Sequence, residues 1–296
     1  MSTGLAPGYG SVIAALRLYK TRVPEASELI QARNRASDWI ARQKLPLSGA
    51  ASRQETPGWR IFRPGHDPGH HLFYVHGGGL VFYSVDDFSS LMEHFAVAGD
   101  CEVTAFHYPK APEHSSGEIM NVLAERIEQR LGEIPAGGEM VFAGDSIGGY
   151  IALYLALRRF PRRFTRLVLI YPVLDVFTQR PSYITYGRGY CLNTEMMGWF
   201  QSLWRGSEFS PFALEASDRA NLPATIVVSA EADVLRDEAF EWCAQLQAAG
   251  LPVEHHHMPN LAHDFCLYAG KIPAAREAVD FIAEQFRPAP MIQERT

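Results

Sequence analysis

The sequence lacks the features that mark membrane proteins, nucleic-acid-binding proteins and disulfide-rich proteins. No apolar run approaches the ~20 residues of a membrane helix, and the first twenty residues show no basic start followed by an apolar stretch and a cleavage site. With 27 Lys plus Arg against 33 Asp plus Glu, no basic excess is available to neutralise a phosphate backbone. We therefore expect a cytoplasmic protein with no membrane span and no nucleic-acid partner.

Cysteine is scarce as well. The 4 cysteines in 296 residues are Cys101, Cys191, Cys243 and Cys266. None belongs to a CxxC pair, so the spacing predicts reduced thiols and neither a disulfide framework nor a zinc site. We expect no metal and no cofactor.

Short strand-like runs begin near residue 57 and alternate with longer helical patterns. They read WRIF, HLFYV, EVTAF, MVFA, RLVLIY, ATIVVS and VEHHH. Strands separated by helix-length segments predict right-handed crossovers and an α/β fold, with a mostly parallel central sheet flanked by helices. With 47% hydrophobic residues the chain can bury the core that such a sheet needs.

Two further segments read as helical. Residues 1–50 show apolar positions at three-to-four spacing, and residues 176–220 interrupt the strand–helix alternation with many aromatics. We predict that both form a cap over the carboxyl ends of the strands, while residues 51–175 and 221–296 form the core. For most of these aromatics the simpler interpretation is that they fill the interface between cap and core.

GDSIGG, residues 144–149, lies between the strand-like MVFA and an apolar helical run. A serine on a strand–turn–helix junction is held in a strained conformation that exposes its hydroxyl, and residues two positions away must be small. Gly144 and Gly148 meet that requirement, so Ser146 is the candidate nucleophile. The following helix directs its N-terminal dipole at developing negative charge.

HGGG, residues 76–79, follows the strand HLFYV. Glycines after a strand let backbone amides approach a ligand, and fixed amides stabilise the oxyanion of acyl transfer. We assign this role to the amides of Gly78, Gly79 and Ile147. A phosphate-binding loop is disfavoured, because the segment has no P-loop lysine and no GxGxxG pattern. His76 is expected to order the loop through hydrogen bonds.

The base and its partner carboxylate are expected on loops after late strands. Asp233 lies in the loop EADVLRDE that follows ATIVVSA, whereas Asp237 and Glu238 are expected to begin the next helix, where negative charge is favourable. His263, in NLAHDF after the strand VEHHHMP, is the candidate base. Residues 255–257 are three histidines within a strand, so their side chains alternate between faces and a metal cluster is not expected.

These motifs resemble the hormone-sensitive-lipase-like esterases of the α/β-hydrolase superfamily. The matching segments are HGGG at 76–79, YPKAPEH at 108–114, GDSIGG at 144–149, YPVLD at 171–175, AEADVLRDE at 230–238 and AHDF at 262–265. The resemblance implies the α/β-hydrolase fold with a two-part helical cap and hydrolysis of short- to medium-chain esters without a cofactor. It also implies supporting roles for His76, Gly77, Gly144, Asp145 and Gly148.

The departures from the family pattern concern the substrate more than the chemistry. Ile147 replaces the usual alanine, Leu80 a frequent aromatic residue, and Asp264 a frequent glycine beside the base; Pro109 and Lys110 replace a common Arg-Leu pair. The acyl pocket is therefore expected to be unusual and the substrate a specialised metabolite. We expect its lining to include Leu80, Tyr83, Tyr190 and Trp199. Glu113 and His114 are expected to be structural.

The sequence thus predicts a serine carboxylesterase that acts on a small-molecule ester through an acyl-enzyme, with Ser146, His263 and Asp233 as its triad. A biosynthetic acyltransferase, dehydratase or lyase on the same scaffold is the main alternative. A ligand-binding receptor is less favoured, because a receptor needs no base and His263 is present. The resemblance also allows a homodimer.

Overall fold

A computed structural model describes residues 4–18, 23–135, 137–175, 177–204 and 209–287. Within them one eight-stranded sheet has the strand order β1-β2-β4-β3-β5-β6-β7-β8. The strands are β1 (Ser52–Glu55), β2 (Trp59–Arg63), β3 (His71–Val75), β4 (Glu102–Phe106), β5 (Met140–Asp145), β6 (Arg166–Ile170), β7 (Ala224–Ala232) and β8 (Val253–Ala262). β3 to β8 pair in parallel, whereas β1 and β2 form an antiparallel edge. The expected α/β fold with a mostly parallel sheet is confirmed.

The central strands are buried on both faces, as a parallel sheet between helices requires. Every residue of β4 is buried, and so are all but the first residue of β3, β5 and β6. Such strands read as continuous apolar runs without polar alternation. That is why HLFYV, EVTAF, MVFA and RLVLI were recognisable as strands from their composition.

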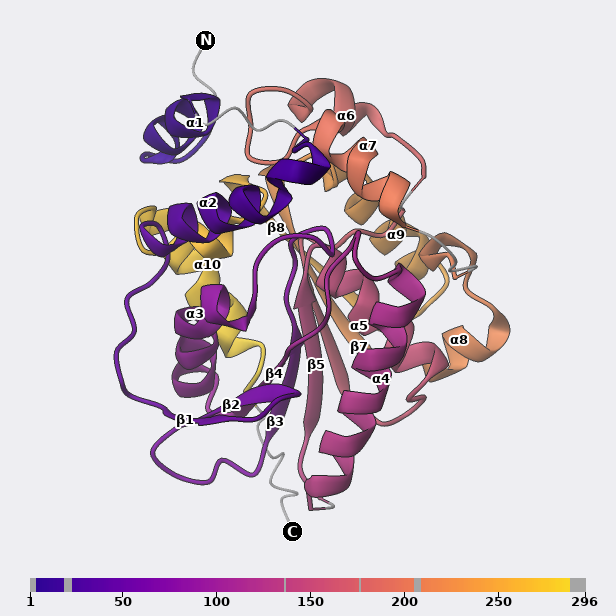
Figure 1. Ribbon diagram of the computed structural model, residues 1–296. Coiled ribbons are helices and arrows are strands. Elements are labelled where there is room, and N and C mark those ends of the chain that lie inside the picture. The colour runs from indigo at the N-terminus through magenta and orange to yellow at the C-terminus, as the bar shows by residue number, and fades with distance from the viewer. Residues whose placement is uncertain (1–3, 19–22, 136, 176, 205–208, 288–296) are drawn as a thin grey trace.

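Helices cover both faces of the sheet (Figure 1). α3 (Val85–Ala98) and α10 (Pro273–Glu284) pack in one apolar core, and α4 (Ser116–Glu133), α5 (Ile147–Arg158) and α9 (Arg236–Ala248) pack in the other. Their starts follow from local chemistry. Capping boxes formed by Ser84 with Asp87 and by Ser115 with Glu118 begin α3 and α4, because each satisfies amides that the first turn leaves without partners.

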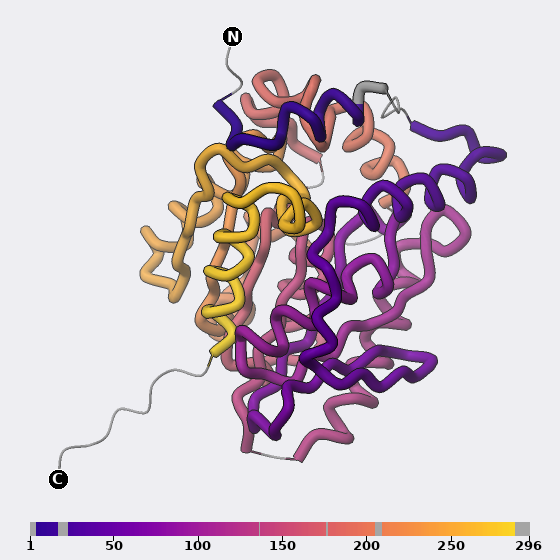
Figure 2. The backbone as a smooth tube through the Cα atoms, turned by 90° about the vertical axis from the view of Figure 1, so that its left-hand side faces the viewer, coloured from indigo at the N-terminus to yellow at the C-terminus, as the bar shows by residue number. Residues whose placement is uncertain are grey.

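Apart from η3 (Phe265–Tyr268), which follows β8, the remaining helices come from the two segments that were expected to be helical. They are α1 (Tyr9–Leu18), η1 (Ala26–Glu28), α2 (Leu29–Ala41), α6 (Pro181–Tyr186), α7 (Thr194–Leu203), η2 (Pro211–Ala213) and α8 (Ala216–Asn221). In both Figure 1 and Figure 2, α1, α2, α6 and α7 gather at one end of the sheet, at the top of the view. No helix of the described ranges has the length and apolar character needed to cross a bilayer.

Two details differ from the sequence-based expectation. β1 was not expected, because its four residues, SRQE, are all exposed and polar and carry no apolar signal. β8 also runs beyond VEHHHMP through Ala262, so NLA belongs to the strand and not to a loop. The extension matters because Ala232 of β7 pairs with Ala262 of β8 after a register irregularity. The next residues, Asp233 and His263, therefore leave the sheet side by side.

Candidate active site

Ser146 sits at the sharp turn between β5 and α5. Its backbone has φ 54° and ψ −122°, a conformation that residues other than glycine rarely adopt. It immediately precedes the first residue of α5. Its amide donates to the Ile170 carbonyl at 2.9 Å, which holds the turn against β6. The strained conformation is maintained by the neighbouring backbone and brings the hydroxyl to the carboxyl end of the sheet, as expected for a nucleophile turn.

The glycines around this serine are required by close backbone approach. A Cβ on Gly144 would collide with the Gly148 carbonyl, and a Cβ on Gly148 would collide with the Val75 carbonyl of β3. The turn can therefore close only with glycine at both positions. This is the steric reason for the small residues on either side of the serine.

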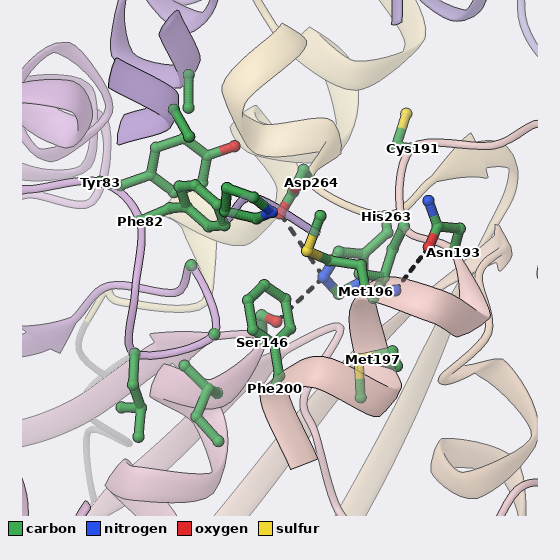
Figure 3. A pocket seen from close by; sticks show the side chains of 18 of the residues that line it. Phe82, Tyr83, Ser146, Cys191, Asn193, Met196, Met197, Phe200, His263 and Asp264 are labelled. Atoms are coloured by element: carbon green, nitrogen blue, oxygen red, sulfur yellow. Dashed lines mark hydrogen bonds and ion pairs between the residues drawn. The ribbon is translucent and has the colours of Figure 1, made fainter. Parts of the chain in front are cut away.

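A continuous hydrogen-bond path joins the three candidate residues, and Figure 3 shows its part between Ser146 and His263. With its proton on Nδ1, His263 donates to Asp233 Oδ2 at 2.7 Å and its Nε2 accepts from Ser146 Oγ at 3.0 Å. The Leu235 amide donates to Asp233 Oδ1 at 2.9 Å, which fixes the carboxylate. The side chains of His263 and Asp233 are only 3% and 1% exposed. The structure thus brings together a hydroxyl, an imidazole and a carboxylate from three distant segments.

The electrostatics favour a charged histidine. Burial alone would lower the pKa of His263, but the carboxylates of Asp233 and then Asp264 outweigh burial and raise this pKa from 6.5 to about 9. An imidazolium is therefore strongly stabilised at this position. That is the species formed when the imidazole takes a proton from a serine hydroxyl.

The loop after β3 approaches the serine closely, since a Cβ on Gly77 would lie 3.1 Å from Ser146 Cβ. Gly78 and Gly79 have φ values of 103° and 62°, and Gly78 O accepts from the amides of Val81 and Phe82. A Cβ on Gly79 would collide with the ring of Phe200 on α7, so the loop and this helix are in close contact. Ile147 is the first residue of α5, where an amide has no carbonyl partner one turn earlier.

Asp145 connects this loop to the nucleophile turn. The carboxyl is fully buried, and its Oδ1 accepts from Tyr74 Oη at 2.7 Å and from the Gly77 amide at 2.9 Å. Burial raises the pKa of Asp145 to about 7. The residue therefore fixes the position of the glycine loop relative to Ser146, a function that the motif alone did not reveal.

His76 orders the same loop from the other side. Its Nδ1 lies 2.7 Å from Gly77 O, Tyr108 Oη donates to His76 O at 2.8 Å, and Lys110 Nζ lies 3.2 Å from Nε2. Burial, together with the nearby Lys110 ammonium, holds the pKa of His76 well below its usual value. The ring is therefore neutral, and its nitrogens contact Gly77, Tyr108 and Lys110, which lie outside the Ser146 hydrogen-bond path. The Glu113 carboxylate of the APEH segment pairs with Arg33 of α2.

A cavity of about 550 Å³ opens above the serine. Its wall includes Ser146, His263, Gly78, Gly79 and Ile147, together with side chains from the N-terminal helices and α7. The residues contributed by these helices are Leu16, Glu28, Ala32, Arg35, Ala36, Trp39, Met196, Met197, Phe200 and Gln201. Their three-to-four spacing along α2 and α7 is the sequence signal that could have identified them. The space is mainly apolar with a few polar groups, as in small-molecule sites.

The four residues that were expected to line the pocket divide into two groups. Leu80 and Tyr83 line the cavity, both with positive φ, at 65° and 66°. Tyr190 and Trp199 do not line it. The Trp199 ring packs on Phe82 at 6.0 Å, behind the cavity wall, and the Tyr190 ring packs edge-on against Tyr186 at 5.3 Å. They fill the interface, which was the simpler interpretation of these aromatics.

The histidines of β8 form no metal site. His255 Nε2 and His257 Nδ1 both lie within hydrogen-bond distance of Ser229 Oγ, at 2.8 and 3.0 Å, whereas the His256 ring packs on Phe281. The side chains alternate between faces as a strand requires. Among the residues that the structure describes, no group of three or more His, Cys, Asp or Glu side chains is arranged to hold a metal ion.

The sequence is similar to a known protein family and to characterised esterases. Residues 72–267 match a family described as having the alpha/beta hydrolase fold. Ethyl acetate hydrolase of Pseudomonas putida is 30% identical over 244 residues, which cover 76% of this chain and 76% of that protein. Esterase LipI of Mycobacterium tuberculosis is 31% identical over 226 residues, which cover 71% of this chain and 69% of that protein.

Solved structures show the same fold. A thermostable esterase from Pseudomonas putida superposes with a TM-score of 0.84 at 22% identity, covering 97% of this chain and 98% of that one. A hyperthermophilic esterase from the archaeon Pyrobaculum calidifontis gives a TM-score of 0.83, also at 22% identity, with 96% and 98% coverage. The fold is therefore shared along nearly the entire chain.

Proposed function

The chain belongs to the hormone-sensitive-lipase-like family of α/β-hydrolase carboxylic ester hydrolases, and from that premise we propose that Ser146, His263 and Asp233 carry out its reaction. The observation that carries the proposal is the unbroken hydrogen-bond path from Ser146 Oγ through the imidazole to the buried carboxylate. It supplies a nucleophile, a base and a group that orients the base.

The proposed reaction has two half-reactions. His263 Nε2 accepts the Ser146 proton while Oγ attacks the ester carbonyl, and the resulting oxyanion is stabilised by the amides of Gly78, Gly79 and Ile147. When the C–O bond to the alcohol breaks, Nε2 passes the proton to the departing oxygen. Water then attacks the acyl-serine while His263 Nε2 accepts a proton from it. When the bond to Oγ breaks, His263 returns that proton to Ser146 and the acid is released. Asp233 keeps the ring in the required tautomer throughout.

The cavity supports esters of short to medium chain length. Its volume of about 550 Å³ suits a small molecule, and the Phe200 ring of α7 limits the space next to Gly79. We propose that residues 1–50 and 176–220 act as a two-part cap around this cavity, because helices from both segments line it. A specialised-metabolite ester is consistent with the unusual side chains in its wall, Ile147 and Asp264 among them.

The direct experiment compares wild type with Ser146→Ala on p-nitrophenyl acetate, butyrate and octanoate. We expect the variant to lose about 10³-fold or more of kcat, because the proposed acyl intermediate forms on the hydroxyl that the substitution removes. A fluorophosphonate should label the wild type at the peptide that contains Ser146. Release of free acid, measured by titration, distinguishes hydrolysis from transfer of the acyl group to an added alcohol.

Two outcomes would contradict the proposal: ester cleavage by Ser146→Ala at the wild-type rate, or labelling of a different serine. Ser229 is the informative comparison, since it also contacts histidine nitrogens but is buried within β7 away from the cavity wall. Label on Ser229 would assign the reaction to His255 and His257 of β8 and not to His263.

We also propose a cytoplasmic location and a homodimer. All four cysteines are free, three of them buried, which suits a reducing compartment. β8 is the last strand of the sheet and is ten residues long, so its outer edge is the natural place for a second copy to pair. Cell fractionation and light scattering on the purified protein test the two statements separately.

A further inference from the structure

Asp264 places a second carboxylate beside the catalytic imidazole. Its Oδ1 lies 3.6 Å from His263 Nε2, the nitrogen that also contacts Ser146 Oγ. The side chain lines the cavity and is 18% exposed within it (Figure 3). The Asp233 carboxylate already occupies the opposite ring nitrogen, so the serine–histidine–aspartate path is complete without Asp264.

Within the described part of the chain, no side-chain hydrogen bond explains an aspartate at residue 264. Its backbone has φ 62°, a left-handed conformation that glycine adopts without strain. An aspartate in this conformation often accepts a hydrogen bond from nearby backbone, but Asp264 precedes η3 (Phe265–Tyr268) without any side-chain capping bond. Among the described residues its carboxylate makes one ion pair, with the His263 ring, and no side-chain hydrogen bond within 3.5 Å. Arg35, which also lines the cavity, forms no ion pair with it.

The carboxylate also opposes efficient general-base catalysis at neutral pH. Burial raises the pKa of Asp264 itself, and the nearby carboxylate raises the pKa of His263 beyond what Asp233 achieves. A more basic imidazole is protonated in more of the free enzyme and is then unable to accept the serine proton. Asp264 thus has an unfavourable backbone conformation, a buried carboxylate and an unfavourable effect on the His263 base. A favourable contact between its carboxylate and a substrate would offset these three costs.

The position of Asp264 shows which part of a substrate it meets. During ester cleavage His263 Nε2 delivers its proton to the departing alcohol oxygen, which must come within about 3 Å of that nitrogen. Asp264 Oδ1 is 3.6 Å from the same nitrogen. The leaving alcohol, and not the acyl chain, therefore lies next to the carboxylate.

We propose that Asp264 binds a hydrogen-bond donor on the leaving alcohol and so selects monoesters of 1,2-diols or 1,2-amino alcohols over esters of simple alkanols. In such alcohols the hydroxyl or ammonium group is two carbons from the ester oxygen. The donor can then lie about 2.7–3.0 Å from Oδ1 while the ester oxygen remains near Nε2. This inference rests on the proposed function and names the substrate class of the same site.

The experiment uses two pairs of acetates that match in shape. The first pair is 2-hydroxyethyl acetate and propyl acetate, and the second is 2-(dimethylamino)ethyl acetate and 3-methylbutyl acetate, assayed at about pH 7, where the amine is protonated. For each pair, the ratio of kcat/KM values is measured for wild type, Asp264→Asn and Asp264→Gly. Because both esters meet the same His263 at the same pH, its protonation cancels in the ratio.

We expect the hydroxyl ester to lose about tenfold or more of its advantage over its alkyl partner in Asp264→Gly, or the ammonium ester to do so in both variants, because the Asn amide oxygen still accepts a hydrogen bond but carries no charge. The pair affected tells whether the donor is neutral or cationic. Asn tolerates the left-handed conformation, and Asp264→Gly removes the side chain without strain, so both variants should fold. Equal thermal midpoints verify this.

The inference is overturned if wild type and both variants cleave the alkyl and donor esters in the same ratio. A uniform loss on all four esters also overturns it, because Asp264 would then act through His263 alone. Failure of the proposed function gives a different result, since no ester would be cleaved by any of the three proteins.

Discussion

Replacing Asp233 by Asn tests how much of the histidine's basicity comes from its partner. The pKa of His263 is raised from 6.5 to about 9 despite complete burial, which corresponds to about 3 kcal/mol of preference for the imidazolium. An amide at residue 233 removes the negative charge and can turn its NH2 group toward Nδ1, which leaves the proton on Nε2. That nitrogen can then no longer accept the Ser146 proton, and kcat should fall by about 10⁴-fold.

The assay is the pH dependence of kcat/KM on p-nitrophenyl acetate. Because the base must be neutral in the free enzyme, wild-type kcat/KM should rise with pH and level off above about pH 9. In Asp233→Asn the rise should move to lower pH, since burial then opposes the imidazolium with less compensation. Asp237→Asn, four residues along and outside the hydrogen-bond path, should keep the wild-type profile. A wild-type rate, or an unchanged inflection, in Asp233→Asn would refute this account.

Three further results are expected. Gly148→Ala should lower the thermal midpoint sharply, because its methyl group would collide with a β3 carbonyl, whereas Gly198→Ala on α7 meets no atom within 4 Å and should be neutral or stabilising; equal midpoints would contradict the steric argument. Phe200→Ala should shift the kcat/KM optimum toward longer p-nitrophenyl esters by opening space beside Gly79; an unmoved optimum would place the acyl chain elsewhere. The folded-state pKa of His263 is raised to about 9, so its contribution to stability is complete below about pH 6.5 and is lost as pH rises through about 9. The free energies of unfolding of wild type and His263→Gln, measured with denaturant, should therefore converge across that range. A difference that stays constant with pH would contradict this linkage.

Much of the fold was predictable because its signals are local. Strands buried on both faces are continuous apolar runs, and the glycine-flanked serine between a strand and a helix identifies a turn that few other residues could form. β1 was not predictable, since four exposed polar residues pair only because β2 lies beside them. Likewise, the sequence did not show that β8 continues to Ala262, because that extension depends on its register with β7.

The wall of the cavity was harder to predict than the reaction centre. Aromatic content in residues 176–220 indicated a packed cap, but composition does not tell which ring faces inward. On α7 the Phe200 ring reaches Gly79 while Trp199, one residue earlier, packs behind Phe82. The sequence showed that Asp264 departs from the family pattern. Its proximity to the catalytic imidazole, at 3.6 Å, could be found only from the structure.

The central claim is that Ser146 is the residue that carries the acyl group, and trapping that intermediate tests it most directly. Wild type mixed with p-nitrophenyl butyrate and quenched in acid within milliseconds should show, by mass spectrometry, one butyryl group on the peptide spanning β5 and α5, localised to Ser146 by fragmentation. Turnover with no acylated serine, or with the acyl group on any other residue, would contradict the account.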